Sequence, residues 1–207
     1  ALATAAPPGA QAAAHAGAAA GWSERDAVAR LKAARRPLFL LGGVGPDSAL
    51  SERGQKAAAR RVAATAGQAF AETFPARAER GAGLPAFDRL PYFPEPARAV
   101  LDAADLVVLA GAATPITYFG YEGHPSQLVE DARLLVVAAP GEDAAGRLAA
   151  LADALDAPAC VPPPAALPPR EDGELTPQRI GATLARLLPE GAVVSVEGGT
   201  CGYPFYA

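Results

Sequence analysis

The residues with the clearest chemical pattern lie near the end of the 207-residue chain. Residues 193–196 predict a strand, and the acid Glu197 ends it. Residues 198–202 (GGTCG) follow directly. Flexible backbone and a hydroxyl at the carboxyl end of a parallel strand suit contact with an anionic cofactor. A strand end that binds no ligand is the alternative.

A second candidate site is a glycine-rich turn after an apolar run. Gly42, Gly43 and Gly45 lie between a predicted strand and a predicted helix. Backbone amides at such a turn can bind a phosphate. The order is G-G-x-G rather than the dinucleotide-binding G-x-G-x-x-G, and Glu72 is the nearest acid to a ribose-contacting position. The alternative is a tight turn that needs glycine only for its own backbone.

Residues 72–96 form the most unusual segment, because they are long for a loop and rich in arginine, proline and aromatic residues. Such segments are often functional or form interfaces. Arg77 and Arg80 could bind a phosphate or a carboxylate. The alternative is an ordered loop that pairs its arginines with Glu79 and Asp88 and packs its aromatic side chains, Phe87, Tyr92 and Phe93, on the domain.

Residues 114–121 follow a strong apolar run and carry three aromatic side chains. This position is the carboxyl edge of a parallel sheet, where ligands of α/β proteins bind. The aromatic side chains could stack on a flat ring, and packing or a subunit interface is the favoured interpretation. His124 is interpreted as a loop residue rather than a catalytic base.

The elements that would position these groups alternate between strand and helix. Short apolar runs predict strands at 38–41, 68–72, 106–110 and 134–138. Helices are predicted from Ser23 to about 36, from Ser48 or Ser51 to about 66, over 97–103 and over 142–155. This alternation indicates a doubly wound parallel α/β sheet, a Rossmann-like domain over residues 22–157.

Three further segments complete the expected organisation. Residues 1–21 predict a flexible linker, and residues 158–175 a stiff proline-rich linker. Residues 176–207 predict the beginning of a second α/β domain, with a helix from Thr176 to about Leu188. A unit this short cannot bury a core of its own. Because the chain also contains no methionine, we expect it to be a fragment of a longer protein.

Composition excludes several classes of function. The net charge of −4 argues against nucleic-acid binding, which requires a basic face. No apolar run approaches the roughly 20 residues that cross a bilayer. Cys160 and Cys201 are far apart and form no CxxC pair, which argues against a structural zinc site and for a cytoplasmic protein.

Several phrases of the sequence together resemble a known family. They are PLFLLGGVG, AETFPARAERGAGLP, RLPYFPEPA and DLVVLAGAATPITYFGYEGHPS, within residues 34–126, and VVSVEGGTCGYPF near the end. They resemble thiamine-diphosphate-dependent enzymes of the acetolactate synthase large-subunit-like group. The resemblance implies the central domain of such an enzyme and the start of its C-terminal, diphosphate-binding domain.

The resemblance also implies a cofactor and a chemistry. Glu197, Gly199, Thr200 and Cys201 would lie at the turn that faces thiamine diphosphate, with Cys201 where serine is expected. Residues 42–45 would form a vestigial nucleotide turn. Some members of the family hold FAD in this domain, so FAD is a possible cofactor that the incomplete glycine fingerprint disfavours. The Gly-Asp-Gly motif that holds Mg²⁺ and the glutamate that activates the cofactor have no counterpart in the sequence.

The expected parent is therefore a homo-oligomeric enzyme that decarboxylates a 2-oxo acid such as pyruvate and joins or releases the product. The chain alone is expected to be inactive. Two alternatives remain open at this stage. One is a free-standing nucleotide-binding module for FAD or NAD, and the other is a non-catalytic oligomerisation scaffold.

Overall fold

The computed structural model describes residues 22–162, 166–170, 172–197 and 199–206. Backbone contacts divide the chain into two compact units, Ala1–Pro163 and Pro164–Ala207. The predicted linker over residues 1–21 lies outside the described residues. No helix in the described part of the chain is long and apolar enough to span a membrane.

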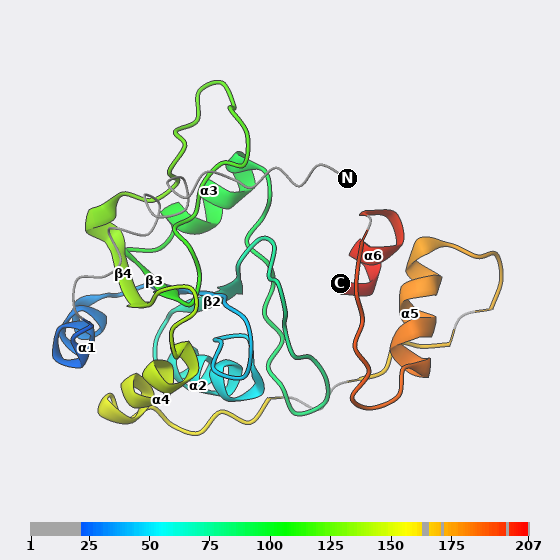
Figure 1. Cartoon of the computed structure of the whole chain (residues 1–207), viewed down its shortest axis with the longest axis horizontal. Helices are drawn as coiled ribbons and strands as arrows, with labels where there is room; N and C mark the ends of the chain where they lie inside the picture. The colour runs from blue at the N-terminus through cyan, green and yellow to red at the C-terminus, as the bar shows by residue number, and fades with distance from the viewer. Residues whose placement is uncertain (1–21, 163–165, 171, 198, 207) are drawn as a thin grey trace, which may run out of the picture. The chain divides into compact units, whose positions relative to one another are not determined.

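The first unit is built on a four-stranded sheet in the order β2-β1-β3-β4 (Figure 1). All three strand pairings are parallel. The strands are β1 (Pro37–Leu41), β2 (Gln68–Ala71), β3 (Leu106–Ala110) and β4 (Leu134–Ala138). Every residue of the two central strands is buried, which explains why these strands are continuous apolar runs. The doubly wound parallel sheet is confirmed.

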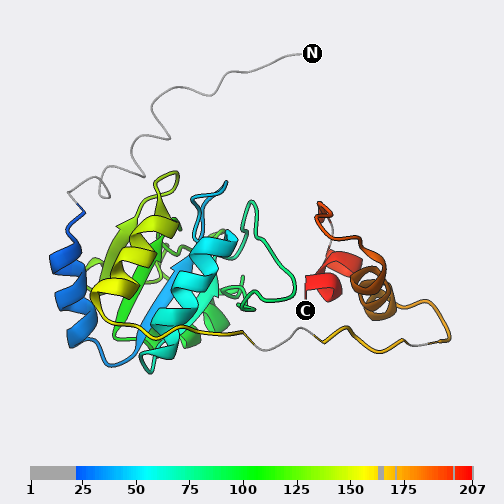
Figure 2. The ribbon, with the colours of Figure 1, turned by 90° about the horizontal axis from the view of Figure 1, so that it is seen from below.

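Helices cover both faces of this sheet. On one face lie α1 (Glu24–Ala33), α2 (Glu52–Ala63) and α4 (Ala144–Ala154), and α2 and α4 run side by side (Figures 1 and 2). The opposite face is covered by α3 (Pro94–Asp102). Helix α3 begins earlier than predicted, because Pro94 occupies its first position, where proline costs no hydrogen bond.

The core alternates along each strand, as the pleat requires. Phe39, Leu41 and Val108 face α1, α2 and α4. Leu38 and Leu109 face α3. All five are at most 2% exposed, so the short apolar runs supply both halves of the core.

The long connection between β2 and α3 folds back on the sheet. Its backbone is tied at both ends: the amide of Glu72 donates to Leu41 (2.8 Å), and the amide of Leu90 donates to Ala71 (2.8 Å). The amide of Ala71 in turn donates to Asp88 (2.8 Å). Residues 88–90 therefore pair with the outer edge of β2.

The second unit contains α5 (Pro177–Leu187) and α6 (Gly199–Tyr206). Thr176 caps α5 as predicted, since its hydroxyl accepts from the amide of Arg179 (3.3 Å). The predicted strand at 193–196 is wrong. A strand forms only against a neighbouring strand, and the described part of this unit offers none; Val193 is 94% exposed.

Candidate functional site

The carboxyl edge of the sheet is where a doubly wound domain binds its ligands. Its strand order reverses between β1 and β3, because the chain passes from β1 to β2 on one side and then to β3 on the other. The crevice between the ends of these two strands is the expected ligand position. Residues 42–45 follow β1, and Gly111 follows β3.

The backbone itself closes this crevice. The amide of Gly42 donates to Ala110 (3.0 Å), and Leu41 forms an isolated bridge with Gly111. A Cβ on Gly111, which has φ +71°, would lie 2.6 Å from the carbonyl oxygen of Gly42. Glycine at position 111 thus serves the close approach of two chain segments.

The glycine turn after β1 packs against a carboxylate of the same chain. The amide of Gly43 donates to Oε1 of Glu72 (3.3 Å). A Cβ on Gly42 would lie 2.7 Å from the same oxygen and 2.8 Å from Cα of Ala112. This geometry favours the tight-turn interpretation of Gly42, while Gly43 and Gly45 adopt φ of +93° and +82°, which glycine tolerates best.

Glu72 is half-buried beside this turn. Desolvation by burial raises the pKa of its carboxyl above the usual value, and the hydrogen bond from Gly43 offsets this rise in part. A phosphate placed at the same turn would have to displace this carboxyl group from the amide of Gly43. The acid predicted near a ribose position therefore lies on the glycine turn itself.

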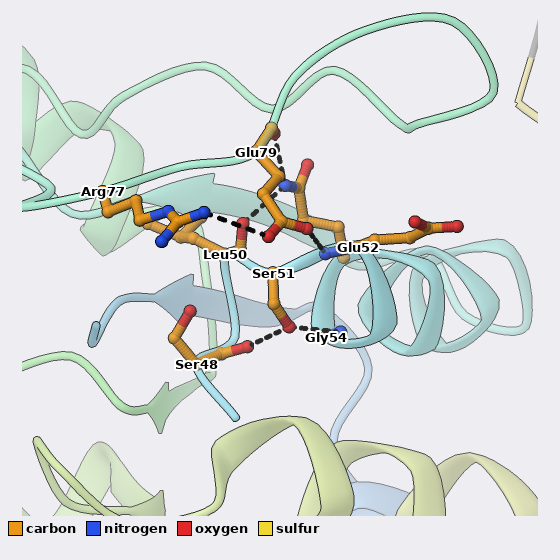
Figure 3. Close-up of polar contacts among 8 residues, drawn as sticks. Ser48, Leu50, Ser51, Glu52, Gly54, Arg77 and Glu79 are labelled. Carbon is orange, nitrogen blue, oxygen red and sulfur yellow. Dashed lines mark hydrogen bonds and ion pairs between the residues drawn. The ribbon is translucent and has the colours of Figure 1, made fainter. Parts of the chain in front are cut away.

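A second carboxylate occupies the N-terminus of α2 (Figure 3). Oε2 of Glu79 accepts from the amide of Glu52, the first residue of α2 (2.5 Å). Arg77 lies 3.7 Å from the other oxygen of Glu79. The pairing of Arg77 with Glu79, one of the two interpretations of this loop, is thereby borne out.

The remaining contacts in Figure 3 hold the same helix N-terminus, that of α2. The N-cap Ser51 accepts from the amide of Gly54 (3.3 Å) and donates to the carbonyl of Ser48 (2.8 Å). The backbone of Glu79 is held as well, since its amide donates to Leu50 (3.0 Å). Ser51, rather than Ser48, is therefore the residue that caps α2.

The N-terminus of α4 also lies at this edge and is capped by its own chain. Oδ1 of Asp143 accepts from the amide of Gly146 (2.7 Å), and the carbonyl of Asp47 accepts from the amide of Ala145 (2.9 Å). The pKa of Glu142 is lowered by the hydrogen bond from the amide of Ala139 and by Arg147.

Aromatic side chains gather at the same edge from the loops after β2 and β3. The ring of Tyr118 stacks on Tyr92 (5.5 Å between centroids) and meets Phe74 edge-on (5.0 Å). Phe93 meets Tyr92 edge-on (5.0 Å). Phe74 and Phe93 stay more than half exposed. The arrangement matches the packing interpretation of residues 114–121 and leaves apolar rings at the surface.

His124 pairs with an acid of α3. Its Nε2 lies 3.2 Å from Glu95, and its side chain is 17% exposed. The histidine thus ties the loop after β3 to α3, in keeping with its interpretation as a loop residue.

The second candidate turn has a different environment. Gly199 and Thr200 lie in the first turn of α6 rather than after a strand. The side chains of Glu197, Thr200 and Cys201 are exposed. Cys160 and Cys201 are free thiols. In the described part of the chain no three His, Cys, Asp or Glu side chains cluster as metal ligands would.

Comparisons with known proteins decide the relationship. The curated protein "Putative acetolactate synthase large subunit IlvX" of Mycobacterium tuberculosis (strain ATCC 25618 / H37Rv) is 44% identical over 175 residues, which are 83% of this chain. This chain is therefore similar in sequence to an acetolactate synthase large-subunit-like protein. The resemblance inferred from the sequence is confirmed. The chain spans 33%, about a third, of that relative. No protein-family model matches it.

Two solved structures share the fold of this chain. A "thiamine diphosphate-dependent 4-hydroxybenzoylformate decarboxylase" of Rhodococcus jostii RHA1 has a TM-score of 0.62 at 18% identity, covering 88% of this chain and 37% of its own. A "putative thiamin diphosphate-dependent enzyme" from Mycobacterium smegmatis has a TM-score of 0.55 at 23% identity, with 81% and 35% covered.

Sequence reasoning missed the two carboxylates as partners of backbone amides. The sequence pattern predicts Glu72 only as a ribose contact and Glu79 only as a partner for arginine. Each acts on an amide 27 or 29 residues away in sequence. Their position in the loop that follows β2 was the available signal, since this loop starts at the same sheet edge.

Proposed function

We propose that this chain is the central domain, with the start of the C-terminal domain, of a thiamine-diphosphate-dependent enzyme that acts on 2-oxo acids. The parent decarboxylates a substrate such as pyruvate and joins or releases the product. The observation that carries the proposal is the 44% identity over 175 residues to an acetolactate synthase-like protein. The shared fold of two thiamine-diphosphate-dependent enzymes supports it.

The role of the first unit in this proposal is structural. Its carboxyl edge is closed by backbone contacts and by two carboxylates. The aromatic rings at that edge provide apolar surface for packing against other parts of a homo-oligomeric parent. Chemistry on the substrate is assigned to residues outside this unit.

The second unit supplies one side of a cofactor contact in this proposal. Glu197, Thr200 and Cys201 offer an acid, a hydroxyl and a thiol, all exposed around Gly199. These groups fit a contact with thiamine diphosphate, which supplies the reactive carbanion chemistry when bound. The described residues do not make up a site for Mg²⁺, so the diphosphate–metal contacts are assigned to other parts of the parent.

Activity and binding assays test the proposal. The purified chain, mixed with pyruvate, Mg²⁺ and thiamine diphosphate, is expected to release no CO₂ above the protein-free control. A longer polypeptide translated from the same reading frame is expected to do so. Turnover by the 207-residue chain alone would contradict the structural role of the first unit, and an inactive longer polypeptide would contradict the assignment of the parent.

A further inference from the structure

The nucleotide position of the first unit contains two acids of the chain itself, and this arrangement suggests a role for the loop between β2 and α3. In a dinucleotide-binding domain, backbone amides of the turn after the first strand and of the following helix bind phosphate oxygens. Here the corresponding amides belong to Gly43 and Glu52. Both donate to carboxylate oxygens of this loop, on Glu72 and Glu79.

We propose that residues 72–79 act as an internal ligand: the carboxylates of Glu72 and Glu79 take the place of nucleotide phosphates, and the domain folds without FAD, NAD or ADP. The two acids bring negative charge to both amide donors. An incoming phosphate must therefore displace part of the loop and also overcome charge repulsion.

The loop is built to hold these acids in place. Nε2 of Gln55, itself 4% exposed, donates to the carbonyls of Leu50 (2.7 Å) and Glu79 (2.6 Å). The amide of Glu79 donates back to Leu50 (3.0 Å). Two hydrogen bonds thus fix the backbone at position 79 independently of the carboxylate, and the Glu79 side chain then reaches the N-terminus of α2 (Figure 3).

Two solution measurements on the unmodified chain test whether the amide donors of Gly43 and Glu52 are already occupied. Calorimetric titration with FAD, NAD or ADP is expected to show no binding at millimolar ligand. Hydrogen exchange is expected to show the Glu52 amide protected at least about tenfold relative to the amide of Glu24, the first residue of α1. Binding of any of the three nucleotides at micromolar concentration, or equally fast exchange at the two amides, overturns the proposal.

Substitution of Glu79 tests whether loss of its carboxylate opens the N-terminus of α2 to an external anion. Glu79→Ala removes the acceptor and is expected to lower the Tm by roughly 2–4 °C. Pyrophosphate should then restore part of the lost Tm, measured against NaCl of equal ionic strength, because an external anion can reach the uncovered amide. Glu24→Ala, which removes an exposed acid from the first turn of α1, is the matched control and should gain no more from pyrophosphate than the unmodified chain.

Glu79→Gln keeps the test decisive if Glu79→Ala does not fold. The amide oxygen of glutamine can still accept from Glu52, so this variant should keep most of the exchange protection at Glu52. A folded Glu79→Ala protein with unchanged Glu52 exchange overturns the proposal, and so does a Glu79→Gln protein in which the Glu52 amide exchanges as fast as the amide of Glu24. So does a folded Glu79→Ala protein that responds to pyrophosphate only as much as the Glu24→Ala control.

Discussion

The two glycine turns of this chain resemble each other in sequence and differ in surroundings. Around Gly42, a Cβ would clash with Glu72 and with the backbone of Ala112. Around Gly199, no heavy atom beyond its two chain neighbours and the backbone of its own helix lies within 4 Å of such a Cβ among the described residues. Glycine is required at the first turn by the packing of the chain against itself. At the second turn no comparable packing requirement exists among the described residues.

The difference teaches that two separate physical causes can place glycine in a turn before a helix and leave the same sequence pattern. One is access for a ligand, and the other is close approach of neighbouring segments. The atoms that surround each glycine distinguish the two causes. Glycine-to-alanine substitutions, which add a methyl group, test the same distinction in solution.

The largest expected effect comes from Gly42→Ala. The added Cβ would overlap the Glu72 carboxylate and the Ala112 backbone at 2.7–2.8 Å, so the variant should lose about 3 kcal/mol of unfolding free energy. Urea unfolding followed by circular dichroism measures this loss. Gly199→Ala is the matched control and should change stability by less than about 0.5 kcal/mol. Equal effects at the two positions would remove the contrast between the turns.

The helix caps provide the next largest effect. Ser51→Ala removes a buried N-cap of α2 that makes two hydrogen bonds, and it should cost about 1–2 kcal/mol. Thr176→Ala removes the partly exposed N-cap of α5 and should cost about 0.5–1 kcal/mol. Thermal and urea unfolding of both variants give the two values. A larger loss for Thr176→Ala would show that the N-cap of α5 contributes more to stability than the buried N-cap of α2.

A smaller effect concerns the pH dependence of stability. Burial raises the pKa of Glu72 in the folded chain, so ionisation of this group opposes folding. Its contribution is favourable below the unfolded-state pKa, near 4.3, and is lost as pH rises through the folded-state pKa. Glu72→Gln should remove that loss. Unfolding free energies of both proteins, measured from pH 4 to pH 8, should therefore diverge in favour of Glu72→Gln as pH rises, and parallel curves would contradict the burial of this carboxyl.

The smallest effect on stability is expected from labelling the cysteines. Cys201 is exposed and Cys160 is partly buried, so a maleimide should modify Cys201 first. Mass spectrometry of peptides identifies the order. Labelled Cys201 should leave the urea transition of the first unit unchanged, because that unit does not include α6. Faster labelling of Cys160 would contradict the exposure of Cys201 in the second glycine turn.

The two central strands of the first unit could be predicted because burial on both faces leaves a direct record in the sequence. Residues 38–41 and 106–110 are continuous apolar runs at the centre of the sheet. The N-caps at Ser23 and Thr176 were also predictable, because capping depends on residues three positions apart. Local chemistry therefore fixed most of the elements.

Two features depended on partners distant in sequence and could not be predicted. Residues 193–196 have strand composition, yet strand formation needs a neighbour that the described second unit lacks. The contacts of Glu72 and Glu79 with the glycine turn and with α2 join positions 27 and 29 residues apart. Neither composition nor periodicity records such pairings.

The return of residues 88–90 to β2 has a consequence for association between molecules. An outermost strand with open backbone groups can recruit a strand from another copy and start aggregation. Here the backbone of Ala71 forms hydrogen bonds with Asp88 and Leu90. These bonds occupy part of the open edge of β2. Shortening the β2–α3 connection would uncover it, so this long, proline-rich insertion also protects the sheet from growing sideways.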